Sequence, residues 1–184
     1  MRDATVTFDW ADGAHSFRLA WGQLAELQEK CDAGPYVVLQ RLHSGAWRIE
    51  DISNIIRLGL IGGGMEPSRA LKLTRAYVED RPPMENLIPA QVILSAALTG
   101  APEEKVGGGR RSKSKDKQLD ELPNGKLRFA AIYGTGAVMG FTPQQVNEMS
   151  VWQFMAAVDG YVEANTPDDG GLTAKEVDEV WEWL

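Results

Sequence analysis

Two different spacings of apolar residues organise the first hundred residues of the chain. Up to residue 21, every second residue is apolar on each side of Asp12-Gly13, a pair suited to a two-residue turn. This alternation predicts a β-hairpin with one apolar face, which must pack against other elements because an isolated hairpin is only marginally stable. The pairs that we expect across the hairpin are Phe8 with Phe17, Val6 with Leu19, and Trp10 with His15.

From residue 24 onward, apolar residues recur three and four positions apart, which is the spacing of amphipathic helices. Gly62-Gly63-Gly64 is a strong signal for a helix end, and Pro89 either starts or kinks the last helix of this region. Val92, Ile93, Ala96 and Ala97 of that helix are expected to help close the core. Residues 1–100 thus predict one module, a hairpin with four or five short helices. The expected helices contain Leu24 to Cys31, follow Gly34-Pro35, run from Ile52 through Leu60, start at Pro67, and extend from Met84 to Leu98.

Residues 101–125 follow neither spacing. The segment reads APEEKVGGGRRSKSKDKQLDELPNG, and residues 101–117 hold 6 Lys+Arg against 3 Asp+Glu, a net charge of +3. A stretch of this composition cannot bury enough apolar surface to offset the entropy of ordering it. We therefore expect a flexible basic linker here.

Helical spacing returns in residues 126–184, which predict a small all-helical module. Leu127 to Met139 form its first helix, with Gly140 as the end signal. Three capping boxes mark further helix starts, at Thr142 with Gln145, Ser150 with Gln153, and Thr173 with Glu176. The chain therefore predicts a mainly α fold with an N-terminal β-hairpin (α+β), arranged as two small helical modules joined by the linker.

Composition and charge narrow the classes of function. Cys31 is the only cysteine, so no internal disulfide can form, and no apolar run is long enough to span a membrane. We expect a soluble, cytoplasmic protein with no membrane partner. The net charge of −7 is concentrated after residue 118, where 3 Lys+Arg stand against 11 Asp+Glu, a net charge of −8. A folded surface of this sign makes a nucleic-acid partner unfavourable, because phosphate binding needs basic residues.

The sequence contains no convincing catalytic, cofactor or metal motif. His15 and His43 are far apart and lack other ligands in metal-binding spacing, and Cys31 lies on an apolar helix face. Gly134-Thr135-Gly136 lacks the preceding strand of a dinucleotide site. Asn165 to Glu176 has the length of a calcium loop, but its third position is proline and its glutamate fits a capping box. We expect no enzyme activity and no cofactor.

Three runs resemble the gene transfer agent family of phage-tail proteins, in the tail tube and tail assembly chaperone group. They are GAWRIEDI at residues 45–52, IRLGLIGGG at residues 56–64, and YVEDRP at residues 77–82. The resemblance covers about the first 100 residues. It implies a non-enzymatic protein of phage or gene transfer agent tail assembly in a bacterial host cell, with no catalytic residues.

The second module is similar to the short helical tail assembly chaperones that tail gene clusters encode downstream. The similarity consists of Gly140-Phe141-Thr142-Pro143 and of Met149-Ser150 followed by Phe154. The two proteins would here be fused in one chain, which departs from the separate-gene arrangement.

Together, these resemblances imply a chaperone that covers the tape-measure protein and recruits tail tube subunits. An apolar groove between helices suits an amphipathic partner helix, and a tethered second module raises the local concentration of its ligand. Self-association is a further expectation. A structural tail component and a nucleic-acid-binding adaptor that uses the basic linker remain as alternatives. The partner-binding residues that we expect are Ile55, Ile56, Leu58, Leu60, Trp152, Phe154 and Trp181.

Overall fold

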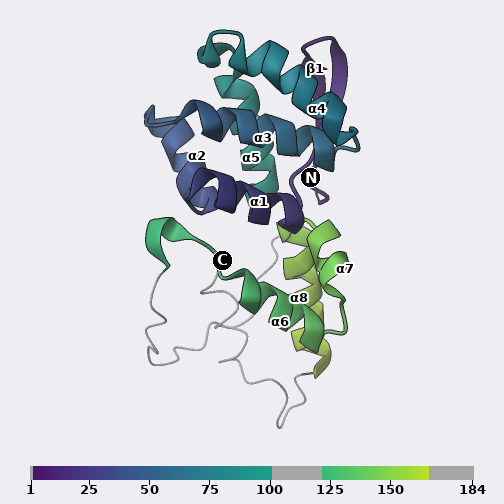
Figure 1. Cartoon of the computed structure of the whole chain (residues 1–184). Helices are drawn as coiled ribbons and strands as arrows, with labels where there is room; N and C mark the ends of the chain where they lie inside the picture. Colours follow the sequence, from purple (N-terminus) through teal and green to yellow (C-terminus); the bar gives the residue numbers. More distant parts are fainter. Residues whose placement is uncertain (1, 101–121, 166–184) are drawn as a thin grey trace.

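The computed structural model describes residues 2–100 and 122–165 of the 184-residue chain. Helices make up most of these residues, and one antiparallel hairpin lies near the N-terminus (Figure 1). The predicted mainly α fold with a small β component is confirmed. The elements in order are β1 (Val6–Trp10), β2 (Gly13–Phe17), α1 (Trp21–Cys31), α2 (Pro35–Ser44), α3 (Ile49–Gly62), α4 (Pro67–Thr74), the π-helical turn η1 (Arg75–Glu79), the 3-10 turn η2 (Pro83–Asn86), α5 (Leu87–Thr99), the 3-10 turn η3 (Pro123–Gly125), α6 (Phe129–Val138), α7 (Pro143–Glu148) and α8 (Val151–Asn165).

The hairpin forms with the predicted apolar face but with a different register. Its two-residue connection is Ala11-Asp12, because Ala11 takes the positive φ of 58° that the prediction assigned to a glycine. The Asp12 carboxylate then lies 2.7 Å from the His15 ring. The partners shift by two residues, so the same side chains still point to the core, and the rings of Phe8 and Phe17 stack with centroids 4.7 Å apart. The observed pairs are Val6 with Phe17, Phe8 with His15, and Trp10 with Gly13.

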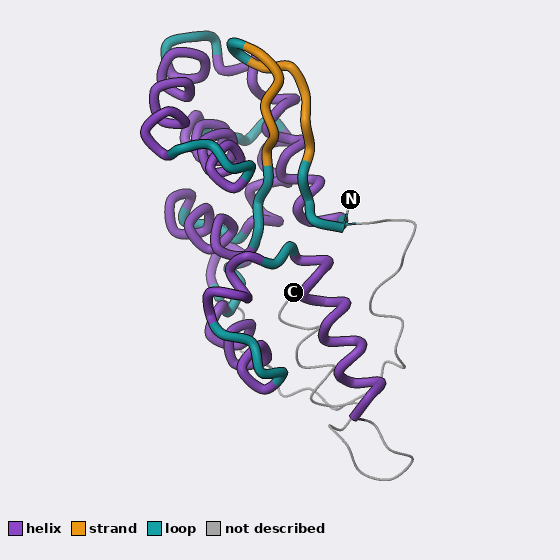
Figure 2. The backbone as a smooth tube through the Cα atoms, turned by 90° about the vertical axis from the view of Figure 1, so that its right-hand side faces the viewer, coloured by secondary structure: helices purple, strands orange, loops and turns teal. Residues whose placement is uncertain are grey.

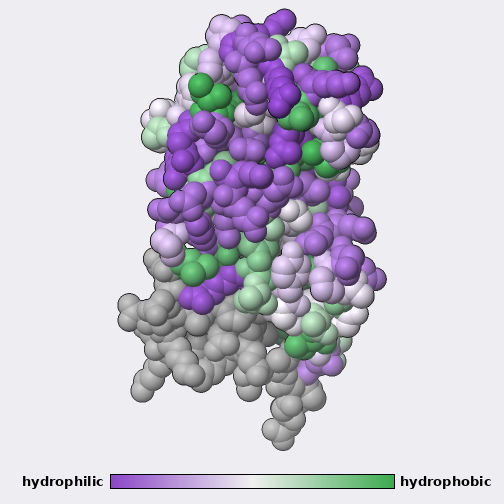
Figure 3. All heavy atoms as spheres, in the orientation of Figure 1, coloured by the Kyte–Doolittle hydropathy of each residue, from purple (hydrophilic) through white to green (hydrophobic). Residues whose placement is uncertain are grey.

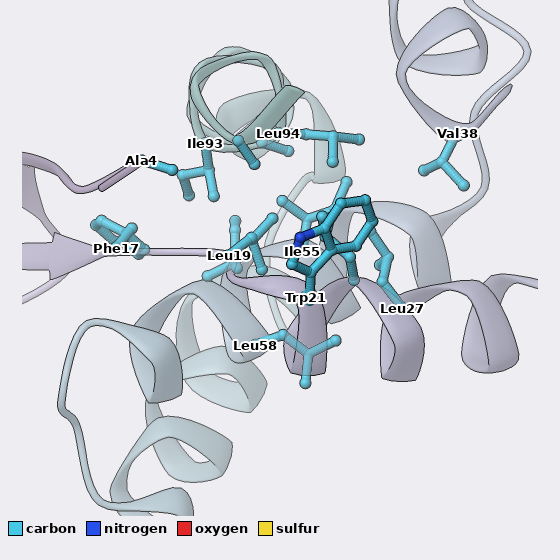
Figure 4. Close-up of a cluster of buried hydrophobic side chains, with 14 of the residues drawn as sticks. Ala4, Phe17, Leu19, Trp21, Leu27, Val38, Ile55, Leu58, Ile93 and Leu94 are labelled. Carbon is cyan, nitrogen blue, oxygen red and sulfur yellow. The ribbon is translucent and has the colours of Figure 1, made fainter. Parts of the chain in front are cut away.

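Helix α3 is the centre of the N-terminal unit and contacts α1, α4, α5 and β2. The second strand leaves the hairpin directly across the end of α3, where the Arg18 N–H donates to the Gly59 carbonyl over 2.9 Å. A Cβ on Gly63 would lie 1.9 Å from the Ser16 carbonyl oxygen. The glycine run therefore ends α3 as predicted, and it also permits close contact between two backbones. Figure 4 draws the side chains of this core, including Leu19, Trp21 and Ile55.

A buried asparagine connects the hairpin to the start of α5. The Trp10 indole donates to the Asn86 side-chain oxygen over 2.8 Å, and the Asn86 amide donates to the Tyr77 carbonyl over 2.7 Å. Pro89 lies in the first turn of α5, where a missing N–H leaves no helical hydrogen bond unmade. Pro89 thus lies at the start of the helix and does not kink it, which is one of the two predicted roles.

The described part of the C-terminal segment, residues 122–165, has the predicted helices and two of the predicted caps. Thr142 accepts from the Gln145 N–H over 3.3 Å, and Ser150 accepts from the Gln153 N–H over 3.1 Å. Each glutamine side chain accepts in return from the N–H of its capping residue, over 2.8 Å and 2.9 Å. The third predicted box, at Thr173, lies outside the described residues.

The C-terminal segment packs against the N-terminal unit, and both contribute to one cluster of buried side chains. Helix α1 contacts α7, and α5 contacts α8 (Figures 1 and 2). The Trp21 indole is fully buried between the edges of Phe129 and Phe154, with ring centroids 6.0 Å and 5.8 Å away. The described helices of the two predicted modules thus pack against each other. The domain boundaries at residues 100 and 126 stay predictions.

The last residues of the predicted linker lie against α2. Pro123–Gly125 form the turn η3 on α2, and the Gly34 N–H donates to the Asn124 carbonyl over 3.0 Å. Backbone hydrogen bonds thus hold these residues in place of the apolar contacts that they lack, and the extent of the flexible linker stays a prediction. Residues 101–121 lie outside the described part of the chain.

Gly34→Ala tests this packing. Gly34 has φ −60° and ψ 149°, which alanine adopts without strain, but a Cβ there would lie 1.7 Å from the Gly125 carbonyl oxygen. We expect the new methyl group to push η3 off α2 and to weaken the attachment of the C-terminal segment by about 1–3 kcal/mol. Native-state hydrogen exchange measures this as lost protection in α6 to α8, with α3 and α5 retaining theirs.

Gly134→Ala is the matched control, because Gly134 is exposed within α6 and a Cβ there meets nothing within 4 Å. It should leave stability unchanged or raise it by up to about 1 kcal/mol. Equal protection in α6 to α8 for both variants would contradict the packing.

Candidate partner-binding site

The aliphatic residues of α3 that the sequence suggested for partner binding are not on the surface. Ile55, Ile56, Leu58 and Leu60 are each at most 1% exposed. The expectation of exposed apolar positions there was wrong, because α1, α4, α5 and the hairpin surround α3 on several sides. These residues form the core on which any binding surface is built.

The aromatic candidates of the C-terminal segment also lie largely inside. Phe154 is fully buried against Trp21. Trp152 is partly buried beside Gly100, and the Arg2 guanidinium lies 6.0 Å from the centroid of its ring. Trp181 lies outside the described residues. Phe154 therefore holds the C-terminal segment on α1, and Trp152 covers the end of α5.

An exposed apolar stripe follows one side of η2 and α5. Met84, in η2, is 63% exposed, and Ile88 and Val92, one turn apart on α5, are 69% and 44% exposed. We call these three residues the α5 stripe. Val92 was expected to close the core, and that expectation was wrong, since Ala90, Ile93 and Leu94 do so.

A signal for the α5 stripe was present in the sequence. Residues 87–99 read LIPAQVILSAALT and contain no charged residue. A helix without charged residues, whose polar positions are only Gln91, Ser95 and Thr99, is normally covered by protein over most of its surface. Helix α5 contacts α2, α3, α8 and β1, yet these neighbours leave its stripe open. An apolar helix side that stays open in the folded chain is the strongest candidate for a protein contact.

The other large exposed apolar residues are distributed singly. They lie on separate elements, as isolated apolar side chains do on most proteins, and the face drawn in Figure 3 is mainly hydrophilic over the N-terminal unit. These residues are Tyr36, Ile49, Leu71 and Val138. None of them repeats at helical spacing with another, so they define no second stripe.

A buried polar cluster fixes the start of α3. The Asp51 carboxylate is fully buried and accepts from the Arg48 N–H over 3.0 Å, while the Arg48 guanidinium lies 3.4 Å from it. The same guanidinium donates to the Cys31 carbonyl. Burial raises the pKa of the Cys31 thiol from 9.0 to about 12, and the Asp51 charge adds to the rise. Cys31 is thus a neutral core residue and no nucleophile.

The histidines and acidic residues of the described ranges form no cluster that could hold a metal ion. Among residues 2–100 and 122–165, no three His, Cys, Asp or Glu side chains lie close enough to share a metal ion. Gly136 packs against Val146, where a Cβ would lie 2.5 Å from the Val146 side chain, so this glycine permits a close helix contact. The proposed calcium loop lies outside the described residues after Asn165. Within the described ranges, no helix combines the length and the apolar character needed to cross a membrane.

Comparison with known proteins identifies a family for the first part of the chain. The profile of the family described as "Phage tail tube protein, GTA-gp10" matches residues 3–100, which is more than half of the 184 residues. This match agrees with the family resemblance and with its extent. No curated protein and no solved structure matches the chain.

The raised pKa of Cys31 predicts a specific loss of stability in alkaline solution. Between 9.0 and about 12 the unfolded thiol loses its proton while the folded one keeps it. The unfolded state then binds fewer protons, so the free energy of unfolding falls as pH rises through this window. Urea denaturation at a series of pH values measures the fall.

Cys31→Ala is the control, because both proteins share every other ionisable group and the contributions of those groups cancel in the difference. The wild type should lose stability more steeply than the variant above pH 9.0 and equally below it. Parallel curves across the whole range would mean that the thiol is accessible to water in the folded chain.

Proposed function

Because the chain belongs to the family of phage tail tube proteins described as GTA-gp10, we propose that it is a non-enzymatic tail assembly chaperone. It binds the tape-measure protein in the cytoplasm of the host bacterium and recruits tail tube subunits to it. Family membership makes the chain tail-related. The chaperone role is our inference from its surface.

The α5 stripe is the observation that supports binding of a tape-measure helix. Ile88 and Val92 lie on one side of α5, and Met84 lies in the preceding turn η2, so an amphipathic partner helix can lie along them. Each of these side chains is at least 44% exposed and therefore has apolar area left to bury on binding. A long helical partner with its own apolar stripe would be kept from aggregating by such contacts.

The packing of the C-terminal segment changes how tube subunits would be recruited. A freely tethered second module was expected, but α6 to α8 are packed on the N-terminal unit. The recruiting surface then moves with the tape-measure-binding surface as one body. Such rigidity fixes the distance between the two bound partners, which suits placing a subunit beside the helix it will enclose.

A structural component of the tail is the second candidate function, and the family description "Phage tail tube protein" favours it. Mass spectrometry of purified particles separates the two. A chaperone leaves before the tube is complete, whereas a wall component remains at a fixed number of copies. Nucleic-acid binding through the basic linker is less favoured, given the net charge of −8 after residue 118.

Ile88→Lys tests the α5 stripe. The substitution places a charge in the middle of the apolar contact, and a desolvated unpaired charge opposes binding strongly. We expect loss of co-purification with the tape-measure protein encoded by the adjacent gene, and a return of that protein to the insoluble fraction. Since Ile88 is 69% exposed, the melting temperature of the variant alone should change little.

Val138→Lys is the matched control, because Val138 is an aliphatic side chain, 61% exposed, on α6 and outside the stripe. It should co-purify like the wild type. If both variants kept the tape-measure protein in solution, α5 would not be the binding surface. If the wild type itself failed to do so, the chaperone proposal would fall.

A further inference from the structure

The C-terminal segment covers one defined face of the N-terminal unit. We call this the α1 face and define it by Arg18, Trp21, Gln28 and Gly34, with Asp32 at its edge. It matters because a face with specific contacts to one chain segment can hold the same segment from a second molecule. The hydrogen bonds and apolar contacts of the α1 face therefore determine which chain segment it can bind.

Most polar contacts of the α1 face are made to backbone atoms of the covering segment. The Trp21 N–H donates to the Met149 carbonyl over 3.0 Å, and the Arg18 guanidinium donates to the Glu148 carbonyl. The Gln28 side chain pairs with Leu127 on both sides, donating to its carbonyl over 3.1 Å and accepting from its N–H over 2.6 Å. The Gln28 amide thus makes the same pair of hydrogen bonds to the backbone of Leu127 that a residue of a neighbouring β-strand makes.

The apolar part of the contact consists mainly of the Trp21 side chain, which inserts between two aromatic side chains of the C-terminal segment. Trp21 is fully buried between Phe129 and Phe154. Within the described residues its indole N–H is buried and has no hydrogen-bond partner. The C-terminal segment therefore leaves the Trp21 indole N–H without an acceptor. The packed arrangement is less stable than one in which this N–H donates a hydrogen bond.

The connection between the two parts permits a second arrangement. Residues 101–121 join Gly100 to Leu122, and 21 residues can span at most about 70 Å when extended. This reach exceeds the diameter of a small domain. A segment that leaves its own α1 face can therefore reach the α1 face of a neighbouring copy, where every contact described above is available to it.

We propose that residues 122–165 of one copy bind the α1 face of a second copy. The bound occupant is known from the structure, since the same segment occupies the same face within one chain. The contact is heterologous, because each copy offers one face and one segment. Reciprocal exchange closes a dimer, and sequential exchange builds a chain of copies. This self-association goes beyond the chaperone function and does not require it.

The two arrangements compete through effective concentration. Within one chain, the connection keeps the segment close to its own face, so a dilute protein stays closed. Copies that gather at high local concentration supply neighbouring segments that compete for an opened face. When the segment leaves, Trp21 becomes exposed, and the N–H groups of Trp21 and Gly34 and the Gln28 amide lose their acceptors. An uncovered α1 face will therefore bind a segment again.

A cysteine pair across the contact tests the exchange. A Cβ on Gly22 would lie 3.3 Å from the Asn147 Cβ, which brings positions 22 and 147 together in the docked segment. Two full-length proteins are prepared in a Cys31→Ala background, one with Gly22→Cys and one with Asn147→Cys. They are mixed at high concentration, oxidised, and separated on a non-reducing gel.

We expect a several-fold excess of disulfide-linked dimer in the mixture over either protein alone, rising with protein concentration. Gly160→Cys is the control for random collision, because position 160 on α8 is exposed and a Cβ there meets nothing within 4 Å. Its mixture with the Gly22→Cys protein should yield no such excess. Peptide mass spectrometry of the dimer should identify a bond between positions 22 and 147.

A third protein with both Gly22→Cys and Asn147→Cys makes the result decisive. If it closes within one chain while the mixture gives no excess of dimer, docking occurs only in cis and the proposal is overturned. If it closes neither within nor between chains, the packing on α1 is itself wrong and the proposal falls with it. The experiment uses only the purified chain, so failure of tape-measure binding would leave its outcome unaffected.

Discussion

Burial of Trp21 is the constraint on which the rest of the structure depends. The side chain begins α1, lies in the core of the N-terminal unit, and is closed on its outer side by Phe129 and Phe154. Removing a fully buried aromatic side chain costs about 3–5 kcal/mol, a large share of the stability of a small domain. The position of α6 to α8 follows from covering this one residue.

The helices and their caps could be predicted from sequence, because local chemistry determines them. Spacing predicted α1 and α3, and hydroxyl and glutamine pairs predicted the starts of α7 and α8. The apolar face of the hairpin was also predictable, because the alternation of apolar and polar residues determines which side chains share a face, and a shift of two residues in the strand pairing leaves that unchanged. The register itself depends on a positive φ at Ala11, a residue that carries no turn preference, and so the turn prediction favoured the neighbouring glycine.

The candidate site was harder to predict, because an apolar stripe does not reveal how many neighbours surround its helix. Helix α3 has the more regular stripe and is enclosed, whereas α5, which contains no charged residue, is open along Ile88 and Val92. The docking of η3 was missed for a related reason. It relies on backbone hydrogen bonds and on the absence of a side chain at Gly34, and neither feature produces a hydrophobic pattern.

The described part of this tail-related protein thus combines the open α5 stripe with an α1 face that its own C-terminal segment covers. That arrangement requires Trp21 to join both parts of the chain in a single core. Nuclear Overhauser measurements on the wild-type chain test this most directly. Cross-peaks between the Trp21 indole and the Phe129 and Phe154 rings, with one rotational correlation time for residues 2–100 and 122–165, are the expected result. Absence of these cross-peaks, with faster tumbling of the C-terminal helices, would contradict it.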